Sequence, residues 1–539
     1  MAHKEREVRK PKTEKSSGNK YFDIHNPVFW PSVFLITILI IGTLFAPETA
    51  EYIFDTLRTG ITTYASWLFV ASVNIFIGFA LYFAFSKFGS IRLGGDKARP
   101  EFSTLSWFAM LFSAGMGIGL MFYAVAEPMW HLMYPPHSEP GSIASIRDSM
   151  GVTFLHWGLH AWAIYAVVAL ALAFFAFNRK LPLSFRSVFY PILGDQIDGW
   201  RGDLIDILAV LATLFGLATS LGLGAAQAGA GMEYVFGISN TINLQVIIIF
   251  GVTSVAVVSV VLGIDKGVKI LSQFNIGLAA LFLTFILIAG PTIYILGSFL
   301  QNIGHYLQYF PTYALWTQTY EEGTFMTTWT IFYWAWWISW SPYVGMFIAR
   351  ISKGRTIKEF VLGVLIVPTL ITFLWMTSFG GSALFLELGG VAEIAAAVEA
   401  DETTSLFVLL DQLPLALITS FLAIILVLSF FVTSSDSGSL VIDGLTSGGK
   451  LESPVGQRIF WATTEGIVAA VLLLGGGLSA LQAGAISTGL PFVIVLLIMC
   501  YSLNKGLHKE YNEMMEKHKA KERESYSDIV ANVIKKQKK

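Results

Sequence analysis

The sequence predicts an all-α integral membrane protein that crosses the bilayer twelve times. Of its 539 residues, 54% are hydrophobic and 13% are charged, whereas about 25% of a soluble domain is charged. The apolar residues gather in twelve runs, and about 20 helical residues are enough to cross a bilayer. Lys and Arg are confined almost entirely to alternate loops between these runs. Composition and charge therefore exclude a soluble protein.

The runs are separated by short polar loops and flanked by two charged tails. We expect a basic tail at residues 1–25 and a charged tail at residues 505–539. The apolar runs cover residues 28–47, 64–86, 104–131, 150–176, 204–235, 243–263, 269–297, 325–350, 358–386, 414–441, 457–477 and 482–504.

The distribution of basic residues predicts the orientation. All of the 35 Lys and Arg residues except Arg58 and Arg147 fall in the two tails or in one set of alternate loops. Loops rich in Lys and Arg remain on the cytoplasmic side. We therefore expect a multi-pass protein of the cell membrane with both termini in the cytoplasm.

Two further segments suit the membrane surface. Residues 299–316 are rich in aromatic side chains and carry no Asp, Glu, Lys or Arg, which favours an amphipathic helix along the outer interface over another span. The C-terminal tail mixes Lys and Arg with Glu at helical spacing. It fits a cytoplasmic helix near anionic lipid, and equally a solvated helix without a regulatory role.

The eighth run contains an unusual concentration of tryptophan. Five of the 15 tryptophans lie in residues 329–342, W-T-I-F-Y-W-A-W-W-I-S-W-S-P. Phe332, Trp336 and Trp340 recur every four residues and form one stripe of a helix. A quaternary ammonium cannot donate a hydrogen bond, and dry aromatic faces attract it by about 2 kcal/mol or more. The stretch fits a cation-binding box or a tightly packed aromatic core helix.

The third run contains alternating glycines. Gly115, Gly117 and Gly119 precede Phe122 and Glu127, and each glycine costs a helix about 1 kcal/mol relative to alanine. We expect a broken helix that lines a cavity and offers backbone carbonyls to a cation or substrate. Close packing of helices through small residues is the alternative.

The tenth run ends in hydroxyl groups. Residues 430–439 read F-F-V-T-S-S-D-S-G-S, and polar groups close to membrane depth are costly unless they are used. Hydroxyl and carbonyl oxygens suit a hard cation such as sodium. A polar helix end at the cytoplasmic interface is the alternative.

The fourth run combines histidines with aromatic residues. His156 and His160 are four residues apart, as in some zinc sites, but no glutamate follows His156 and no third ligand is evident. We expect both histidines to be satisfied within the protein interior. Trp157, Trp162 and Tyr165 fall within one side of the helix and could complete an aromatic cage. The whole sequence lacks a phosphate-binding loop and a catalytic triad, which argues against an enzyme or pump and predicts no cofactor and no nucleic-acid partner.

Three motifs together resemble the betaine/choline/carnitine transporter family. They are G-M-G-I-G-L-M-F at 115–122, the Trp157, Trp162 and Tyr165 set, and W-A-W-W-I-S-W-S-P at 334–342. The resemblance covers nearly the whole chain apart from the tails. It implies a LeuT-like core of two inverted five-helix repeats, residues 104–297 and 325–504, preceded by two N-terminal helices at 28–86.

The resemblance implies residues for a substrate site, two gates and a sodium site. The substrate site consists of aromatic side chains and the glycine segment: Trp157, Trp162, Tyr165, Trp337, Trp340, Met116, Gly117 and Gly119. The gates are Phe122 and Phe332. The sodium ligands are carbonyls and hydroxyls, from Ser113, Met116, Phe430, Thr433 and Ser434.

A second sodium site would use Thr213. Here Leu217 and Tyr343 stand where the best-known family pattern has a threonine and a phenylalanine. A leucine side chain cannot ligate sodium, so the sequence leaves the number of sodium ions open.

The resemblance also implies a function. It indicates a secondary active transporter that imports glycine betaine or a related compatible solute by sodium symport with alternating access, in osmoprotection. Family members that take choline tend to have aspartate at the position of Gly119, whereas glycine suits a zwitterion. A sodium-independent exchanger or importer of choline, carnitine or ectoine is the alternative. Some members are trimers, which predicts a homotrimer in membrane lipid.

Overall fold

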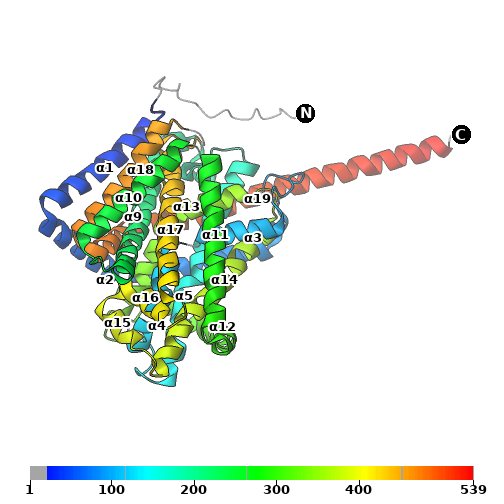
Figure 1. The fold of residues 1–539 in the computed structure, drawn as a ribbon. Helices are drawn as coiled ribbons and strands as arrows, with labels where there is room; N and C mark the ends of the chain where they lie inside the picture. The colour runs from blue at the N-terminus through cyan, green and yellow to red at the C-terminus, as the bar shows by residue number, and fades with distance from the viewer. Residues whose placement is uncertain (1–20, 116, 263, 451–452, 538–539) are drawn as a thin grey trace.

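The computed structural model describes residues 21–115, 117–262, 264–450 and 453–537, which fold into a bundle of helices (Figure 1). Within these ranges the only extended pairing is an isolated bridge between Arg92 and Thr356. The prediction of an all-α fold is confirmed.

Fifteen of the helices have twelve or more residues. They are α1 (Asn26–Phe45), α2 (Pro47–Phe85), α3 (Thr104–Gly115), α4 (Ile118–Met133), α5 (Ile143–Trp157), α6 (Leu159–Ala173), α9 (Trp200–Phe236), α10 (Ile242–Leu262), α11 (Ile264–Ala289), α12 (Thr292–Leu315), α13 (Ile331–Ile351), α14 (Ile357–Leu388), α17 (Ala416–Thr446), α18 (Val455–Leu474) and α19 (Gly477–Gln537). Short helices fill the connections: η1 (Lys87–Ser90), η2 (Phe174–Asn178), α7 (Phe185–Val188), α8 (Tyr190–Leu193), η3 (Gly194–Asp198), η4 (Met326–Thr330), α15 (Ile394–Ala400), η5 (Glu402–Thr404) and α16 (Ser405–Asp411).

Most of the predicted runs correspond to membrane-spanning helices. Ten helices of the described residues are long and apolar enough to cross a membrane, or eleven if α3 and α4 form one span, with α5, α6 and η2 counted together. The aromatic α13 is outside this set, as is α12, which covers the predicted interfacial segment. The multi-pass class is confirmed, and the count of twelve spans remains a prediction.

Two spans are interrupted, and both interruptions bear on the site. The axes of α3 and α4 meet at 67°, so the break predicted from the glycine segment is confirmed. A second break, between α5 and α6, occurs at Gly158, whose φ of −101° and ψ of −134° lie outside the helical region. A Cβ at Gly158 would lie 2.8 Å from the ring of Phe373. By contrast, α13 continues without a break through Pro342.

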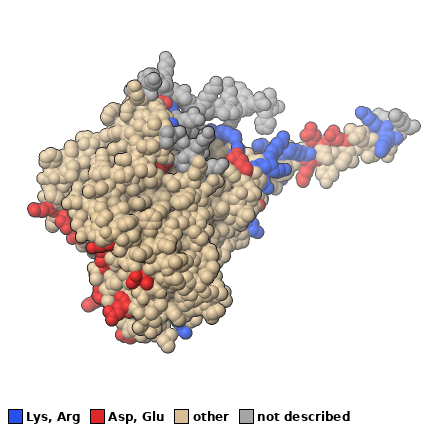
Figure 2. All heavy atoms as spheres, viewed as in Figure 1, with Lys and Arg blue, Asp and Glu red and all other residues tan. Residues whose placement is uncertain are grey.

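The charged residues separate to the two ends of the bundle. In Figure 2, Lys and Arg gather at the end from which α19 projects, whereas Asp and Glu gather mainly at the opposite end and along one side. Uncharged surface lies between them. The predicted orientation, with the loops rich in Lys and Arg on the cytoplasmic side, requires that these residues gather at one end of the bundle.

The C-terminal tail is helical, as its residue spacing predicts. It continues the last span as part of the 61-residue helix α19, which projects from the bundle (Figure 1). Arg179 binds Glu510 at 3.0 Å and Glu513 at 2.9 Å. From Met515 to Gln537 the tail is exposed. The bundle therefore holds only the first part of the tail.

Candidate functional site

The predicted aromatic box assembles in the core from three helices. Trp157 ends α5, Trp162 and Tyr165 lie on α6, and Trp337 and Trp340 lie on α13. Each of these side chains is at most 6% exposed. The Trp337 ring centroid lies 4.9 Å from that of Trp157 and 6.4 Å from those of Tyr165 and Trp340. Side chains more than 170 positions apart in the sequence therefore surround one small volume.

Trp157, Trp162 and Tyr165 lie on one span, Ile143–Asn178, as predicted, but the span is interrupted at Gly158. The break at Gly158 places Trp157 at the end of α5, whereas the other two lie on α6. The ring of Trp162 meets that of Tyr165 edge to face at 5.6 Å. Both parts of the span contribute rings that meet Trp337, since Trp157 lies 4.9 Å and Tyr165 lies 6.4 Å from it.

The glycine segment lies directly against the box. A Cβ at Gly115 would lie 2.1 Å from the ring of Trp162, and a Cβ at Gly119 would lie 2.7 Å from Trp336 and 2.9 Å from Trp157. Contacts below 3.0 Å require a neighbour to move, and here the neighbours are rigid rings. The alternating glycines therefore let the backbone approach the tryptophans. Met116 lies outside the described residues.

Two polar groups of the box have no hydrogen-bond partner among the described residues. They are the hydroxyl of Tyr165 and Nε1 of Trp340, and both are buried. The two rings lie 6.5 Å apart. A hydroxyl and an indole N–H can both donate to a carboxylate, while the ring faces attract an ammonium group. The box therefore offers complementary groups to both ends of a small zwitterion.

A cavity of about 270 Å³ approaches the box from the predicted outer side. Its lining combines aromatic, charged and amide side chains: Arg58, Tyr123, Trp130, Thr328, Trp329, Phe332, Glu402, Leu478, Ser479 and Gln482. Phe332, a predicted gate, stacks on Trp336 at 5.3 Å between the cavity and the box. Phe122, the other predicted gate, is fully buried beside Tyr123, at 4.8 Å.

Glu402 brings a carboxyl group to this cavity from outside the spans. Burial raises the pKa of the Glu402 carboxyl, and the hydrogen bond from Trp130 Nε1, 3.1 Å long, opposes that shift.

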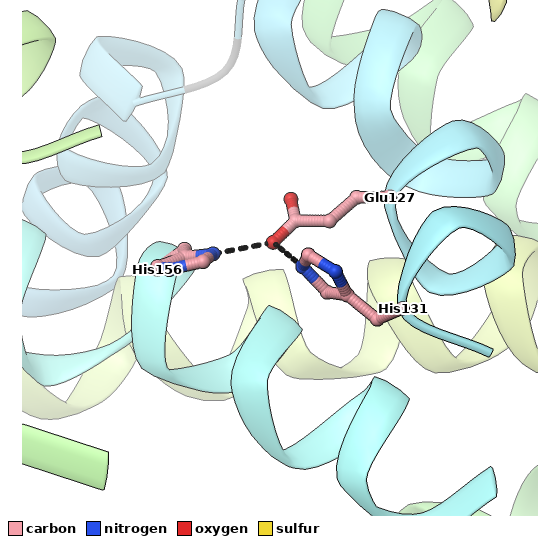
Figure 3. A group of neighbouring side chains, drawn as sticks. All are labelled: Glu127, His131 and His156. Atoms are coloured by element: carbon pink, nitrogen blue, oxygen red, sulfur yellow. Dashed lines mark hydrogen bonds and ion pairs between the residues drawn. The ribbon is translucent and has the colours of Figure 1, made fainter. Parts of the chain in front are cut away.

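A buried carboxylate lies behind the box. Glu127 of α4 is fully buried, and its Oε1 accepts from His131 Nε2 at 3.2 Å and from His156 Nδ1 at 2.6 Å (Figure 3). Its Oε2 accepts from Trp157 Nε1 at 2.6 Å and from the Tyr333 hydroxyl at 2.5 Å. One carboxylate therefore joins α4, α5 and α13.

Glu127, His131 and His156 carry side chains of the kinds that bind a metal ion. Ligand atoms of Glu127, His131 and His156 lie within 4.8 Å of one another. Each carboxylate oxygen already accepts two hydrogen bonds, and His156 Nε2 lies 3.0 Å from the Thr330 hydroxyl. These contacts describe a hydrogen-bond network. The sequence signal for it was a glutamate within an apolar run, which by default marks function.

Both ring nitrogens of His156 have hydrogen-bond partners, as predicted, but only one ring nitrogen of His160 has one among the described residues. His160 Nε2 lies 3.4 Å from Asn74 Oδ1, whereas its buried Nδ1 has no hydrogen-bond partner among the described residues.

In the hydroxyl segment of α17, the Thr433 side chain is hydrogen-bonded within the protein. The Thr433 hydroxyl lies 3.1 Å from the carbonyl oxygens of Ser429 and Phe430, and it accepts from Asn275 Nδ2 at 3.1 Å. Ser434 is buried on the same helix. Ser113 lies on α3 and is partly buried. The proposed sodium ligand set remains a prediction.

The second sodium site also remains a prediction. The Thr213 hydroxyl donates to the Ala209 carbonyl at 2.6 Å. Tyr343 meets the ring of Trp340 at 5.5 Å. Leu217 packs against α17, because a Cβ at Gly438 would lie 2.2 Å from its Cδ1.

A multi-pass helical bundle with a broken span beside a buried aromatic group is typical of membrane transporters. Residues 27–512 match the family model described as BCCT, betaine/carnitine/choline family transporter. The chain belongs to this family, whose members are transporters and not enzymes.

Several relatives align over nearly the whole chain. The glycine betaine/proline/choline/ectoine transporter of Vibrio parahaemolyticus is 51% identical over 500 residues, which cover 91% of this chain and 88% of the relative. Glycine betaine transporter 1 of the same organism is 50% identical over 499 residues, covering 91% and 95%. The glycine betaine transporter of Acinetobacter baylyi is 44% identical over 499 residues, covering 92% and 76%.

Proposed function

We propose that this protein imports glycine betaine, or a related compatible solute, across the cell membrane by sodium symport. The observation that carries the proposal is the buried aromatic box with two unpartnered donors, Tyr165 Oη and Trp340 Nε1. The ring faces would hold the ammonium group and the two donors would hold the carboxylate. Names of the similar transporters support glycine betaine as substrate.

Transport would proceed by alternating access. On the predicted outer side the cavity ends at Phe332, and a cavity of about 390 Å³ on the opposite side is lined by Glu101, Arg350 and Lys353 among others. None of the five box residues lines either cavity, which supports a box that is closed to both sides in this state. Rocking of one five-helix repeat against the other would open one cavity to the box at a time.

Sodium would supply the energy for accumulation. The ligands would be the backbone carbonyls of Ser113, Met116 and Phe430 with the hydroxyls of Thr433 and Ser434. A membrane potential of about 100 mV contributes about 2.3 kcal/mol per charge, which corresponds to roughly fifty-fold accumulation. Such accumulation suits osmoprotection. We further propose a homotrimer in membrane lipid with both termini in the cytoplasm.

Uptake of labelled glycine betaine into proteoliposomes, with and without an inward sodium gradient, tests this function. Accumulation only with sodium is the expected result. Equal uptake without sodium would instead favour a sodium-independent exchanger or importer. If glycine betaine is not taken up, labelled choline, carnitine, proline and ectoine should be tested in the same assay as the alternative substrates.

A further inference from the structure

Glu127 is a buried carboxylate with two histidines beside it. It is fully buried in α4, and its ion-pair contacts among the described residues are to His131 and His156. A buried anion costs several kcal/mol unless hydrogen bonds or a counter-ion compensate it. Four groups point hydrogen-bonding atoms at its two oxygens, and two of them, the Trp157 indole and the Tyr333 hydroxyl, act as donors there. This surrounding suits the ionised carboxylate.

The two histidines beside Glu127 differ in their contacts. His131 can donate from Nε2, but its Nδ1 is buried without a partner among the described residues. A protonated ring would bury an unsatisfied N–H, whereas a neutral ring leaves only an acceptor unpaired. In His156, Nδ1 lies 2.6 Å from Glu127 Oε1, and Nε2 lies 3.0 Å from the Thr330 hydroxyl, which can donate or accept. The anionic group of this network is therefore the Glu127 carboxylate.

This charge is connected directly to the aromatic box. The Trp157 indole that donates to Glu127 also meets the ring of Trp337 at 4.9 Å. Trp337 in turn donates from Nε1 to the backbone carbonyl of His156 at 2.9 Å. Two box tryptophans are thus fixed, one by Glu127 itself and the other through a residue bonded to Glu127.

We propose that Glu127 is a positioning residue that also makes the box selective for a cationic head group. It orients Trp157 directly and Trp337 through His156, and its negative charge favours an ammonium over an uncharged group of the same shape. Opposite charges within about 10 Å at an effective dielectric constant of about 20 give a preference of roughly tenfold. The inference rests on the proposed function, because it takes the box as the substrate site.

A pair of ligands with the same shape and different charge provides the test. In 3,3-dimethylbutyrate a carbon atom replaces the ammonium nitrogen of glycine betaine, and the carboxylate is kept. Binding of both ligands to the purified full-length protein is measured by competition with labelled glycine betaine. The readout is the ratio of the two Kd values in the wild type, Glu127→Gln and Glu127→Asp. Binding replaces uptake here, so that a variant unable to complete the transport cycle still gives a result.

Glu127→Gln keeps the side-chain size and removes the charge, so it should reduce the Kd ratio about tenfold. Glu127→Asp keeps the charge and should retain at least part of the preference. Asp148→Asn is the matched control, because Asp148 is a buried carboxylate on α5 that accepts from the Tyr313 hydroxyl at 2.6 Å and lies outside the box. Its ratio should equal that of the wild type.

Two results would overturn the inference. One is an unchanged ratio of Kd values in Glu127→Gln. The other is an equal loss of affinity for both ligands in Glu127→Gln and in Glu127→Asp, because that result indicates a purely structural role. A wild type that does not distinguish the two ligands would contradict the proposed function itself. Failure of the inference about Glu127 and failure of the proposed function therefore give different results in this experiment.

Discussion

The aromatic segment of α13 and the hydroxyl segment of α17 were both predicted as binding sites. In the structure the aromatic side chains contact other helices, whereas the Thr433 hydroxyl contacts mainly its own helix. Trp337 and Trp340 meet rings from α5 and α6 in one closed group. The Thr433 hydroxyl instead lies against carbonyls of its own helix. Aromatic rings gain most from packing against other rings, whereas a hydroxyl can be satisfied by the preceding turn. The aromatic box is thus already assembled, whereas a cation would have to draw the Thr433 hydroxyl away from the carbonyls of its helix.

The largest effect is expected from Trp337→Leu, which removes a wall of the box. Loss of one desolvated cation–π contact costs about 2 kcal/mol or more, and the His156 carbonyl also loses its donor. Uptake of glycine betaine should fall to background while the protein remains folded, as judged by gel filtration. Trp461→Leu is the control, because Trp461 is fully buried and donates to Thr446 on α17, outside the box. Undiminished transport by Trp337→Leu would remove the box assignment.

A smaller loss is expected where the glycine segment meets the box. In Gly119→Ala the added Cβ would lie 2.7 Å from Trp336 and 2.9 Å from Trp157, and overpacking of this kind costs about 1–3 kcal/mol. The KM for glycine betaine should rise about thirtyfold. Gly78→Ala on α2 has no atom within 4 Å of its Cβ and should leave KM unchanged. Equal KM values for both variants would contradict the close approach.

The hydroxyl segment should respond through sodium and not through substrate. Thr433→Ala removes a proposed ligand, and a hydrogen-bond-like contact to a charged group contributes about 1.5–3 kcal/mol. The sodium concentration for half-maximal uptake should rise at least about tenfold. Thr433→Ser, which keeps the hydroxyl, should behave like the wild type. An unchanged sodium dependence of Thr433→Ala would discard this ligand.

Local pattern predicted the spans and the first break, but not the contacts between helices. Hydropathy placed α9 and α14 within a few residues, and the glycines at 115–119 predicted the bend between α3 and α4. At the break, a Cβ on Gly158 would lie 2.8 Å from Phe373, which belongs to α14 and is more than 200 residues away. No local signal marks such a contact.

The contacts of Glu127, the carboxylate behind the box, likewise could not be predicted from local sequence pattern. His156 was compared with His160 because they are four residues apart, yet the partners of His156 are Glu127 and Thr330. A sequence pattern gives the spacing within one helix, whereas the network joins α4, α5 and the turn before α13. The glutamate itself was visible in the sequence, but its four donors were not.

The smallest effect should come from Asn275, and it tests whether the α17 hydroxyl must be released to bind sodium. Asn275 Nδ2 donates to Thr433 Oγ1 at 3.1 Å and so occupies a lone pair that a cation would need. Such a hydrogen bond contributes about 0.5–1.5 kcal/mol net, so Asn275→Ala should lower the half-saturating sodium concentration about threefold. Titration of uptake with sodium measures this change. Thr284→Ala is the control, because Thr284 lies on the exposed side of α11, the helix that also carries Asn275. A higher sodium requirement in Asn275→Ala would show that Asn275 helps to form the site, and the contrast between the preformed box and the occupied hydroxyls would no longer hold.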